Sequence, residues 1–235
     1  MNLNTCSCIN CRSELPPRNI MRGFERNKTA RNKIVIYCPT CNAARIKAEM
    51  GRQAVLDRLA REQARAEKWE AICPAEFATI DRAKLPYPAL LHRVLAWDYN
   101  PRGLLLHGPT GRGKSRVLWA LGKREFFAGR DFVALDATTL MRYSSLLMRD
   151  GGEADRLVDQ LCKCPLILLD DVFKTKLTEA REELLFQVLE FRTSRQLPIL
   201  VTTNDTGPSL TARFSQDRGE PFVRRLREFC EDVKA

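Results

Sequence analysis

Eight residues at 108–115, GPTGRGKS, constrain the fold of this chain more than any other segment. They match the pattern G-x-x-x-x-G-K-[ST], a glycine-rich loop whose backbone N–H groups surround phosphate oxygens. An apolar run at 104–106 precedes the loop, and a helical pattern at 117–127 comes after it. A loop of this kind between a strand and a helix predicts a nucleotide site at the edge of a parallel sheet. The alternative is a glycine-rich turn without a ligand.

The chemistry gives each position of this phosphate-binding loop a role. The glycines permit tight turns, Lys114 places a positive charge on the β- and γ-phosphates, and the Ser115 hydroxyl is a ligand for Mg²⁺. We therefore expect ATP as the nucleotide. The predicted ATP-binding residues are Gly108, Pro109, Thr110, Gly111, Arg112, Gly113, Lys114 and Ser115.

A second element indicates hydrolysis of the bound nucleotide. Residues 166–169 form a continuous apolar run that ends in Asp170 and Asp171, 56 residues after Lys114. A continuous run is typical of a parallel strand that is buried on both faces, and ligands bind at the carboxyl ends of such strands. We expect Asp170 to hold Mg²⁺ and Asp171 to polarise the attacking water.

Asn204 comes after a third apolar run, at 199–201, and two threonines. At the end of a core strand its amide can hydrogen-bond the attacking water or the γ-phosphate. The alternative is a turn cap, which is a common role for an isolated asparagine.

The distribution of cysteines, prolines and apolar runs divides the chain into three parts. They are a module at 1–41, a helical linker at 42–71 and an ATPase domain at 72–235. Residues 42–70 contain no proline and one glycine, and they predict a long, exposed, amphipathic helix. From residue 103 onward, apolar strands alternate with helices, which predicts an α/β fold with a mostly parallel sheet flanked by helices. The strands are expected at 103–107, 132–136, 165–169 and 198–202, and the helices at 114–128, 137–149, 154–162 and 178–194.

The first module holds a cysteine pattern with the spacing of a metal site. Cys8 and Cys11 form one C-x-x-C pair, Cys38 and Cys41 form another, and 26 residues separate the pairs. Two such pairs complete a tetrahedral Zn²⁺ site, and metal binding supplies the folding energy that so small a module lacks. A short strand at 35–37 leads into the second pair, as in a zinc ribbon. Cys6 in place of Cys8, and a redox role for either pair, stay open as alternatives.

Charge and hydropathy narrow the range of partners. The net charge is +10, and residues 1–48 carry nine Lys or Arg against two Glu, a net charge of +7. Such a block can contact phosphates or an acidic protein, and it can also be a solvated basic surface. No apolar stretch approaches the roughly 18 residues that span a bilayer, and the N-terminus lacks a signal-peptide core. We expect a soluble, cytoplasmic protein without a membrane partner.

The phosphate-binding loop, the paired aspartates and Asn204, in this order, resemble the AAA+ ATPase superfamily, in which this asparagine is called sensor 1. The resemblance implies self-association in a ring or spiral, with ATP between subunits and an arginine finger donated by the neighbouring subunit. The segment at 223–228 is similar to the arginine-bearing helix of DnaC/DnaI-type replicative-helicase loaders and of IstB-like ATPases. Matching by position assigns the finger to Arg225, with Arg224 and Arg227 as second choices.

The resemblance to helicase loaders extends to both ends of the ATPase core. Ten residues come after Arg225, so we expect no C-terminal helical lid, and helicase loaders resemble this chain in having little or none. Adenine contacts must then come from elsewhere, and we expect them around 77–81. The placement of a zinc module before the ATPase core also resembles that of some helicase loaders. In those loaders the module docks onto the helicase.

The resemblance implies an ATP-dependent helicase loader for DNA replication, with a replicative DNA helicase and single-stranded DNA as partners. An IstB-like ATPase that acts with a transposase on duplex DNA is the alternative. A DNA-binding regulator with a vestigial ATPase conflicts with the intact Lys114, Asp170 and Asn204. Metabolic kinases share the loop, but the paired aspartates and the basic cysteine module fit them poorly.

Overall fold

The computed structural model describes residues 6–15, 26–28, 34–79, 87–149, 151–215 and 217–235. The chain divides into two compact units, Met1–Arg65 and Ala66–Ala235. The finer division into 1–41, 42–71 and 72–235 stays a proposal. Within the described ranges, no helix combines the length and the apolar character that a membrane crossing requires.

The first unit contains two small antiparallel hairpins and most of a long helix. Strand β1 (Cys6–Ser7) pairs with β2 (Glu14–Leu15), and β3 (Arg26–Lys28) pairs with β4 (Ile34–Ile36). Helix α1 (Pro39–Ile72) begins three residues before the expected helix and ends two residues after it. Proline suits a helix start because the first N–H groups have no partner within the helix. Cys41 therefore lies in the first turn of α1.

The second unit is built on a five-stranded parallel sheet in the order β6-β7-β8-β5-β9. Strands β7 and β8 lie one residue later than predicted. The bounds are β5 (Gly103–His107), β6 (Phe132–Asp136), β7 (Leu166–Asp170), β8 (Ile199–Thr203) and β9 (Cys230–Lys234).

Strand β9 was not predicted from the sequence. Its residues read CEDVK, and only Cys230 and Val233 are buried. As an edge strand it is paired on one side only, to β5, so it lacks the continuous apolar run of the central strands.

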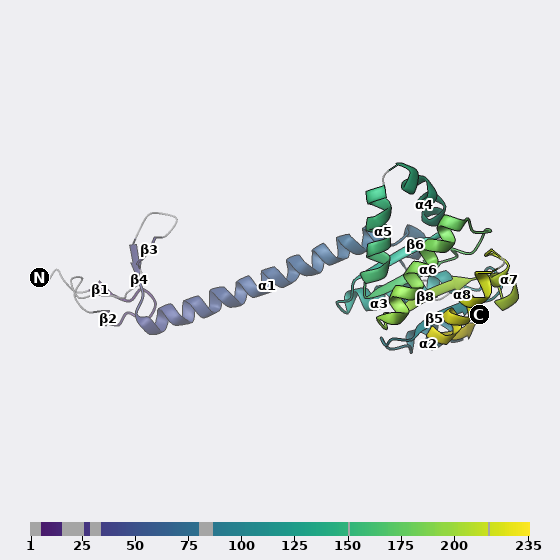
Figure 1. Cartoon of the computed structure of the whole chain (residues 1–235). Coiled ribbons are helices and arrows are strands. Elements are labelled where there is room, and N and C mark those ends of the chain that lie inside the picture. Colours follow the sequence, from purple (N-terminus) through teal and green to yellow (C-terminus); the bar gives the residue numbers. More distant parts are fainter. Residues whose placement is uncertain (1–5, 16–25, 29–33, 80–86, 150, 216) are drawn as a thin grey trace, which may run out of the picture. The chain divides into compact units, whose positions relative to one another are not determined.

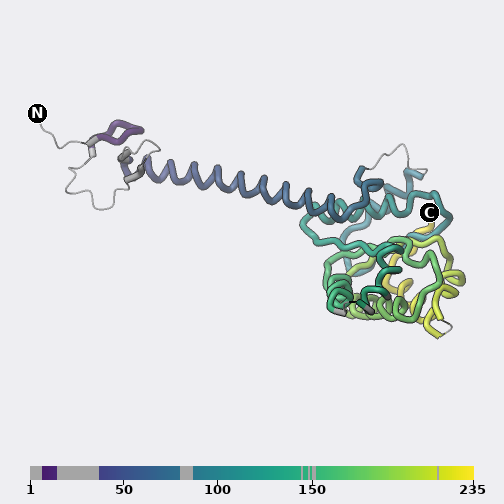
Figure 2. Tube along the Cα trace, turned by 90° about the horizontal axis from the view of Figure 1, so that it is seen from above, coloured from purple at the N-terminus to yellow at the C-terminus, as the bar shows by residue number. Residues whose placement is uncertain are grey.

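Helices cover both faces of this sheet, as predicted (Figures 1 and 2). One face packs against the end of α1, α2 and α3, and the other against α4, α5, α6, α7 and α8. Successive strand residues point to opposite faces, so Leu104 and Leu106 join the first core while Leu105 joins the second. The bounds are α2 (Pro88–Leu95), α3 (Lys114–Phe127), α4 (Ala137–Arg149), α5 (Gly151–Lys163), α6 (Glu179–Ser194), α7 (Gly207–Thr211) and α8 (Gly219–Phe229).

Arg192 of α6 is fully buried and joins three segments of the second unit. Its guanidinium donates to five backbone carbonyls at the end of α5, before β7 and before β8. Burial lowers the pKa of Arg192 to about 10. The carbonyl oxygens belong to Leu161, Cys162, Cys164, Pro165 and Pro198, at 2.8, 3.3, 2.7, 3.2 and 2.6 Å.

Replacing Arg192 with leucine is expected to lower the free energy of unfolding by about 3 kcal/mol, because buried carbonyls lose a charged donor. Urea denaturation measures the difference. Arg195→Leu is the matched control, since Arg195 is exposed just after the same helix. Equal stability of the two variants would contradict the role given to Arg192.

Candidate nucleotide-binding site

The phosphate-binding loop joins β5 to α3, and all three of its glycines have positive φ angles that favour glycine. Gly113 caps the N-terminus of α3 with a φ of 80°. Gly108 has a φ of 140°, and a Cβ atom there would lie 2.8 Å from the carbonyl oxygen of Ala235. The loop therefore brings its backbone to the start of a helix, where free N–H groups and the helix dipole favour an anion.

Lys114 is the first residue of α3, and its side chain reaches back to the start of this loop. Its Nζ donates to the carbonyl oxygens of Gly108 and Pro109 at 2.7 and 2.9 Å. It also donates to Asn204 Oδ1 at 2.7 Å. Burial lowers the pKa of Lys114, and the nearby carboxylates of Asp171 and Asp170 oppose that effect. The structure thus brings together two of the predicted residues, Lys114 and Asn204, which are 90 positions apart in the chain.

Asp170, at the end of β7, is buried and accepts three hydrogen bonds. Oδ1 accepts from Ser115 Oγ and from Thr202 Oγ1, both at 2.6 Å. Oδ2 accepts from the indole nitrogen of Trp119 at 3.1 Å. Hydroxyl and carboxylate oxygens are the ligands that Mg²⁺ takes in nucleotide sites, so the adjacent Ser115 and Asp170 fit this ion.

Asp171 takes a backbone conformation that is uncommon for a non-glycine residue, with a φ of 52°. Its N–H donates to Thr202 Oγ1 at 2.9 Å, and its Oδ1 accepts from Asn204 Nδ2 at 3.2 Å. Burial raises the pKa of Asp171, while Lys174 and Lys114 oppose the shift. A raised pKa suits a general base that acts near neutral pH.

These groups line a pocket of about 450 Å³ above the loop. Glu76 and Phe77 form one wall, and the Phe77 ring stacks on Trp119 with centroids 5.9 Å apart. Of the segment 77–81, expected to contact adenine, the structure describes residues 77–79, and Phe77 lines the pocket. Residues 80 and 81 lie outside the described residues. The pocket is lined by Glu76, Phe77, Thr110, Gly111, Arg112, Gly113, Lys114, Ser115, Arg116, Asp171, Thr202 and Asn204.

Sequence reasoning missed Thr202 and Trp119, which both contact Asp170. A threonine within a wholly buried strand was an available signal, because a buried hydroxyl needs a hydrogen-bond partner. Asp205 was also missed. It forms a two-bond ion pair with Arg213, at 2.8 and 3.1 Å, next to Asn204.

The family model described as "IstB-like ATP binding protein" matches residues 84–221, more than half of the chain. The chain belongs to this family of IstB-like ATP-binding proteins. The matched segment of this IstB-like protein includes the phosphate-binding loop, both aspartates and Asn204, and it ends just before Arg225.

Solved structures confirm the predicted P-loop AAA+ fold. DnaI is similar with a TM-score of 0.55 and 20% identity, over 69% of this chain and 94% of that chain. The DnaC helicase loader gives a TM-score of 0.51 and 22% identity, over 62% and 85%. DnaA from Aquifex aeolicus with bound AMPPCP has a TM-score of 0.51 and 17% identity, over 63% of this chain and 44% of that chain. In the described part of this IstB-like protein, no helical lid comes after α8.

Among curated proteins, DnaA of Campylobacter jejuni subsp. jejuni serotype O:6 (strain 81116 / NCTC 11828) is 26% identical over 113 residues. The match covers 48% of this chain and 24% of that DnaA. The uncharacterized protein YdaV of Escherichia coli (strain K12) is 24% identical over 97 residues, 41% of this chain and 39% of YdaV. The IstB-like chain thus shares its AAA+ fold with DnaI, the DnaC helicase loader and DnaA, and it spans 24% of the curated DnaA and 39% of YdaV.

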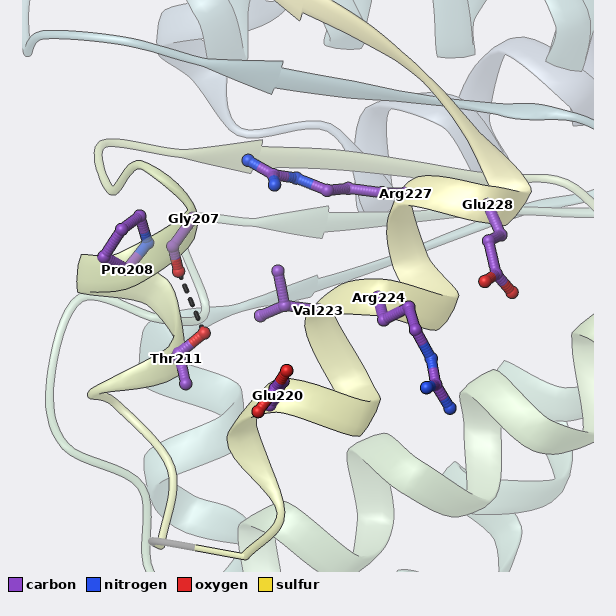
Figure 3. Close-up of a pocket in the computed structure, with 8 residues that line it drawn as sticks. All are labelled: Gly207, Pro208, Thr211, Glu220, Val223, Arg224, Arg227 and Glu228. Carbon is purple, nitrogen blue, oxygen red and sulfur yellow. Dashed lines mark hydrogen bonds between the residues drawn. The ribbon is translucent and has the colours of Figure 1, made fainter.

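The three candidate finger arginines lie on α8 in different surroundings. The Arg225 guanidinium forms an ion pair with Glu190 of α6, and both side chains are about half exposed. Arg224 and Arg227 line a groove of about 750 Å³ between α7 and α8 (Figure 3). Arg227 extends toward Gly207, where a Cβ atom would lie 2.7 Å from its guanidinium (Figure 3). None of the three lines the pocket above the phosphate-binding loop of the described chain.

The four predicted zinc ligands come together in the first unit. The Sγ atoms of Cys8, Cys11, Cys38 and Cys41 all lie within 4.8 Å of one another, and those of Cys11 and Cys38 are 3.7 Å apart. Four thiolates about 2.3 Å from one Zn²⁺ stand about 3.8 Å apart in a tetrahedron. The cluster therefore fits a zinc ribbon. Of the alternative ligand Cys6, the structure describes the backbone only.

Hydrogen bonding favours a thiolate at Cys8. Backbone N–H groups of Cys11 and Cys38 lower the pKa of Cys8 to about 6. The neighbouring Cys38 sulfur raises the pKa of Cys41 to about 12. The shift at Cys8 thus comes from backbone donors and the shift at Cys41 from a neighbouring sulfur, and a bound cation would favour the thiolate at both.

Proposed function

We propose that this protein hydrolyses ATP at the site above the phosphate-binding loop. Asp171 accepts the proton of the attacking water, and Asn204, held between Lys114 and Asp171, orients that water. Ser115 and Asp170 would hold Mg²⁺, whose charge would stabilise the β- and γ-phosphate oxygens. Arg225 of a neighbouring copy supplies the finger, in a ring or spiral of subunits.

The biological role that we propose is loading of a replicative DNA helicase onto single-stranded DNA. The observation that carries it is the likeness in fold to DnaI, over 94% of that chain, together with the likeness to the DnaC helicase loader. The zinc module offers a separate docking element for the helicase, and the basic segment of residues 1–48 offers charge for DNA. Much of that segment, 16–25 and 29–33, lies outside the described residues.

Affinity purification of the tagged chain from its host with ATP and Mg²⁺ tests this role. A hexameric helicase should be recovered, and recovery should fall when ATP is omitted or when Lys114→Ala is used. Recovery of a transposase with tight binding to duplex DNA, and no helicase, would replace this role with the IstB-like alternative. The match to the IstB-like family model is the reason to test for a transposase and for duplex binding as well.

We also propose that the four-cysteine cluster holds one Zn²⁺. Cys38→Ser is expected to remove about one zinc per chain, because three thiolates leave the tetrahedron incomplete. Elemental analysis of the purified protein measures it. Cys73→Ser is the control, since Cys73 is buried in the second unit and should leave the zinc content unchanged. ATP turnover per chain should be similar in both variants, and zinc retained by Cys38→Ser would exclude this ligand set.

A further inference from the structure

Trp119 donates a hydrogen bond to the carboxylate of Asp170, the predicted Mg²⁺ ligand. Nothing in the sequence pattern assigns Trp119 a role. It lies on α3 four residues after Ser115, so both side chains emerge from the same face of the helix. Ser115 reaches Asp170 Oδ1 and Trp119 reaches Oδ2, at 2.6 and 3.1 Å. The indole N–H can only donate and an ionised carboxylate can only accept, so the direction of this hydrogen bond is fixed.

Three aromatic rings pack against the ring of Trp119. It is 3% exposed. It stacks on Phe77, a wall of the nucleotide pocket, with an angle of 16° between the rings. Trp69 and Phe132 meet it edge-on, with centroids 6.0 and 5.6 Å away. A donor that cannot move fixes the orientation of the carboxylate that it binds.

We propose that Trp119 is a positioning residue for the metal site: its N–H holds Asp170 Oδ2 so that Oδ1 stays directed toward Ser115 and the phosphate-binding loop. The inference rests on the proposed ATPase function. Without this donor, Oδ2 has lost its partner in a buried site, and the carboxylate is free to turn away from the loop.

Trp119→Phe removes the N–H group and keeps an aromatic ring beside Phe77. The Mg²⁺ concentration for half-maximal turnover should rise about tenfold, with turnover at saturating Mg²⁺ within about threefold of the parent. Affinity for a fluorescent ADP analogue in EDTA should be unchanged, while the gain in affinity on adding Mg²⁺ should shrink. The control is Trp97→Phe, whose indole donates to the Arg102 carbonyl outside the pocket. An unchanged Mg²⁺ dependence in Trp119→Phe overturns the proposal.

A measurement on the chain without added Mg²⁺ does not depend on the folding of the tryptophan variant. Three tryptophans give three indole signals in a ¹H–¹⁵N spectrum. Asp170→Asn should shift the Trp119 signal strongly and leave the Trp97 signal in place. A Trp119 signal that does not respond to Asp170→Asn means that the bond is absent in solution, and the proposal fails.

Failure of the proposed function gives a different result. If the parent chain binds nucleotide but does not turn over ATP, the ATPase proposal fails. The effect of Mg²⁺ on ADP affinity and the indole signal then still decide whether Trp119 positions Asp170.

Discussion

Lys114→Ala is expected to remove nucleotide binding and to lower ATP turnover by about 100-fold or more, because the loop loses the charge that faces the phosphates. The same change separates Asn204 from the loop, since Lys114 Nζ is the donor to Asn204 Oδ1 at 2.7 Å. Binding is measured with a fluorescent ATP analogue and turnover by phosphate release. Zinc content should not change.

Lys163→Ala is the matched control for this variant. Lys163 is an exposed lysine at the end of α5 that pairs only with a carboxylate of its own helix among the contacts described, Asp159 at 2.7 Å. Exposed pairs of this kind contribute little to stability. Parent-like turnover in Lys114→Ala would remove the nucleotide site from this loop.

Arg225→Ala is expected to keep ATP binding and to lower turnover per subunit by about 1,000-fold, which is the range for loss of an arginine finger. The variant retains every residue that lines the pocket above its own loop. The loss should persist at high protein concentration, where subunits associate. Steady-state turnover over a range of protein concentrations, with ATP affinity measured alongside, checks it.

A mixing experiment tests whether the arginine acts between subunits. Lys114→Ala subunits keep Arg225, and Arg225→Ala subunits keep the nucleotide site, so mixed assemblies contain some complete interfaces. Turnover should therefore reappear on mixing the two inactive variants. No recovery on mixing, in assemblies shown to contain both variants, would contradict donation between subunits.

Arg224→Ala and Arg227→Ala decide among the three arginines of α8. Arg225 pairs with Glu190 in the isolated chain, but both groups are about half exposed, so separating them costs little. Arg224 and Arg227 already line the open groove beside α7. If Arg227→Ala loses turnover and Arg225→Ala does not, the finger is Arg227.

The central strands and the cysteine cluster were predictable because each has a strong local signal. Continuous apolar runs mark β5, β7 and β8, and the phosphate-binding loop has a fixed spacing. The two C-x-x-C pairs predicted a cluster that the structure brings within 4.8 Å. Strand β9 escaped prediction because only two of its five residues, Cys230 and Val233, are buried, so it carries no apolar run.

The sequence by itself determined the order of β5 to β8, the helices between them and the residue types at the nucleotide site, since short-range patterns and motif spacing carry this information. Tertiary structure alone decided which side chains donate hydrogen bonds to Asp170, the predicted Mg²⁺ ligand. Thr202 and Trp119 reach Asp170 from β8 and α3, 32 and 51 positions away, because parallel pairing and helix packing bring those elements beside β7. The physical reason is that hydrogen bonds to a buried carboxylate depend on where the packed elements place their donors, and no spacing in a single chain records that geometry.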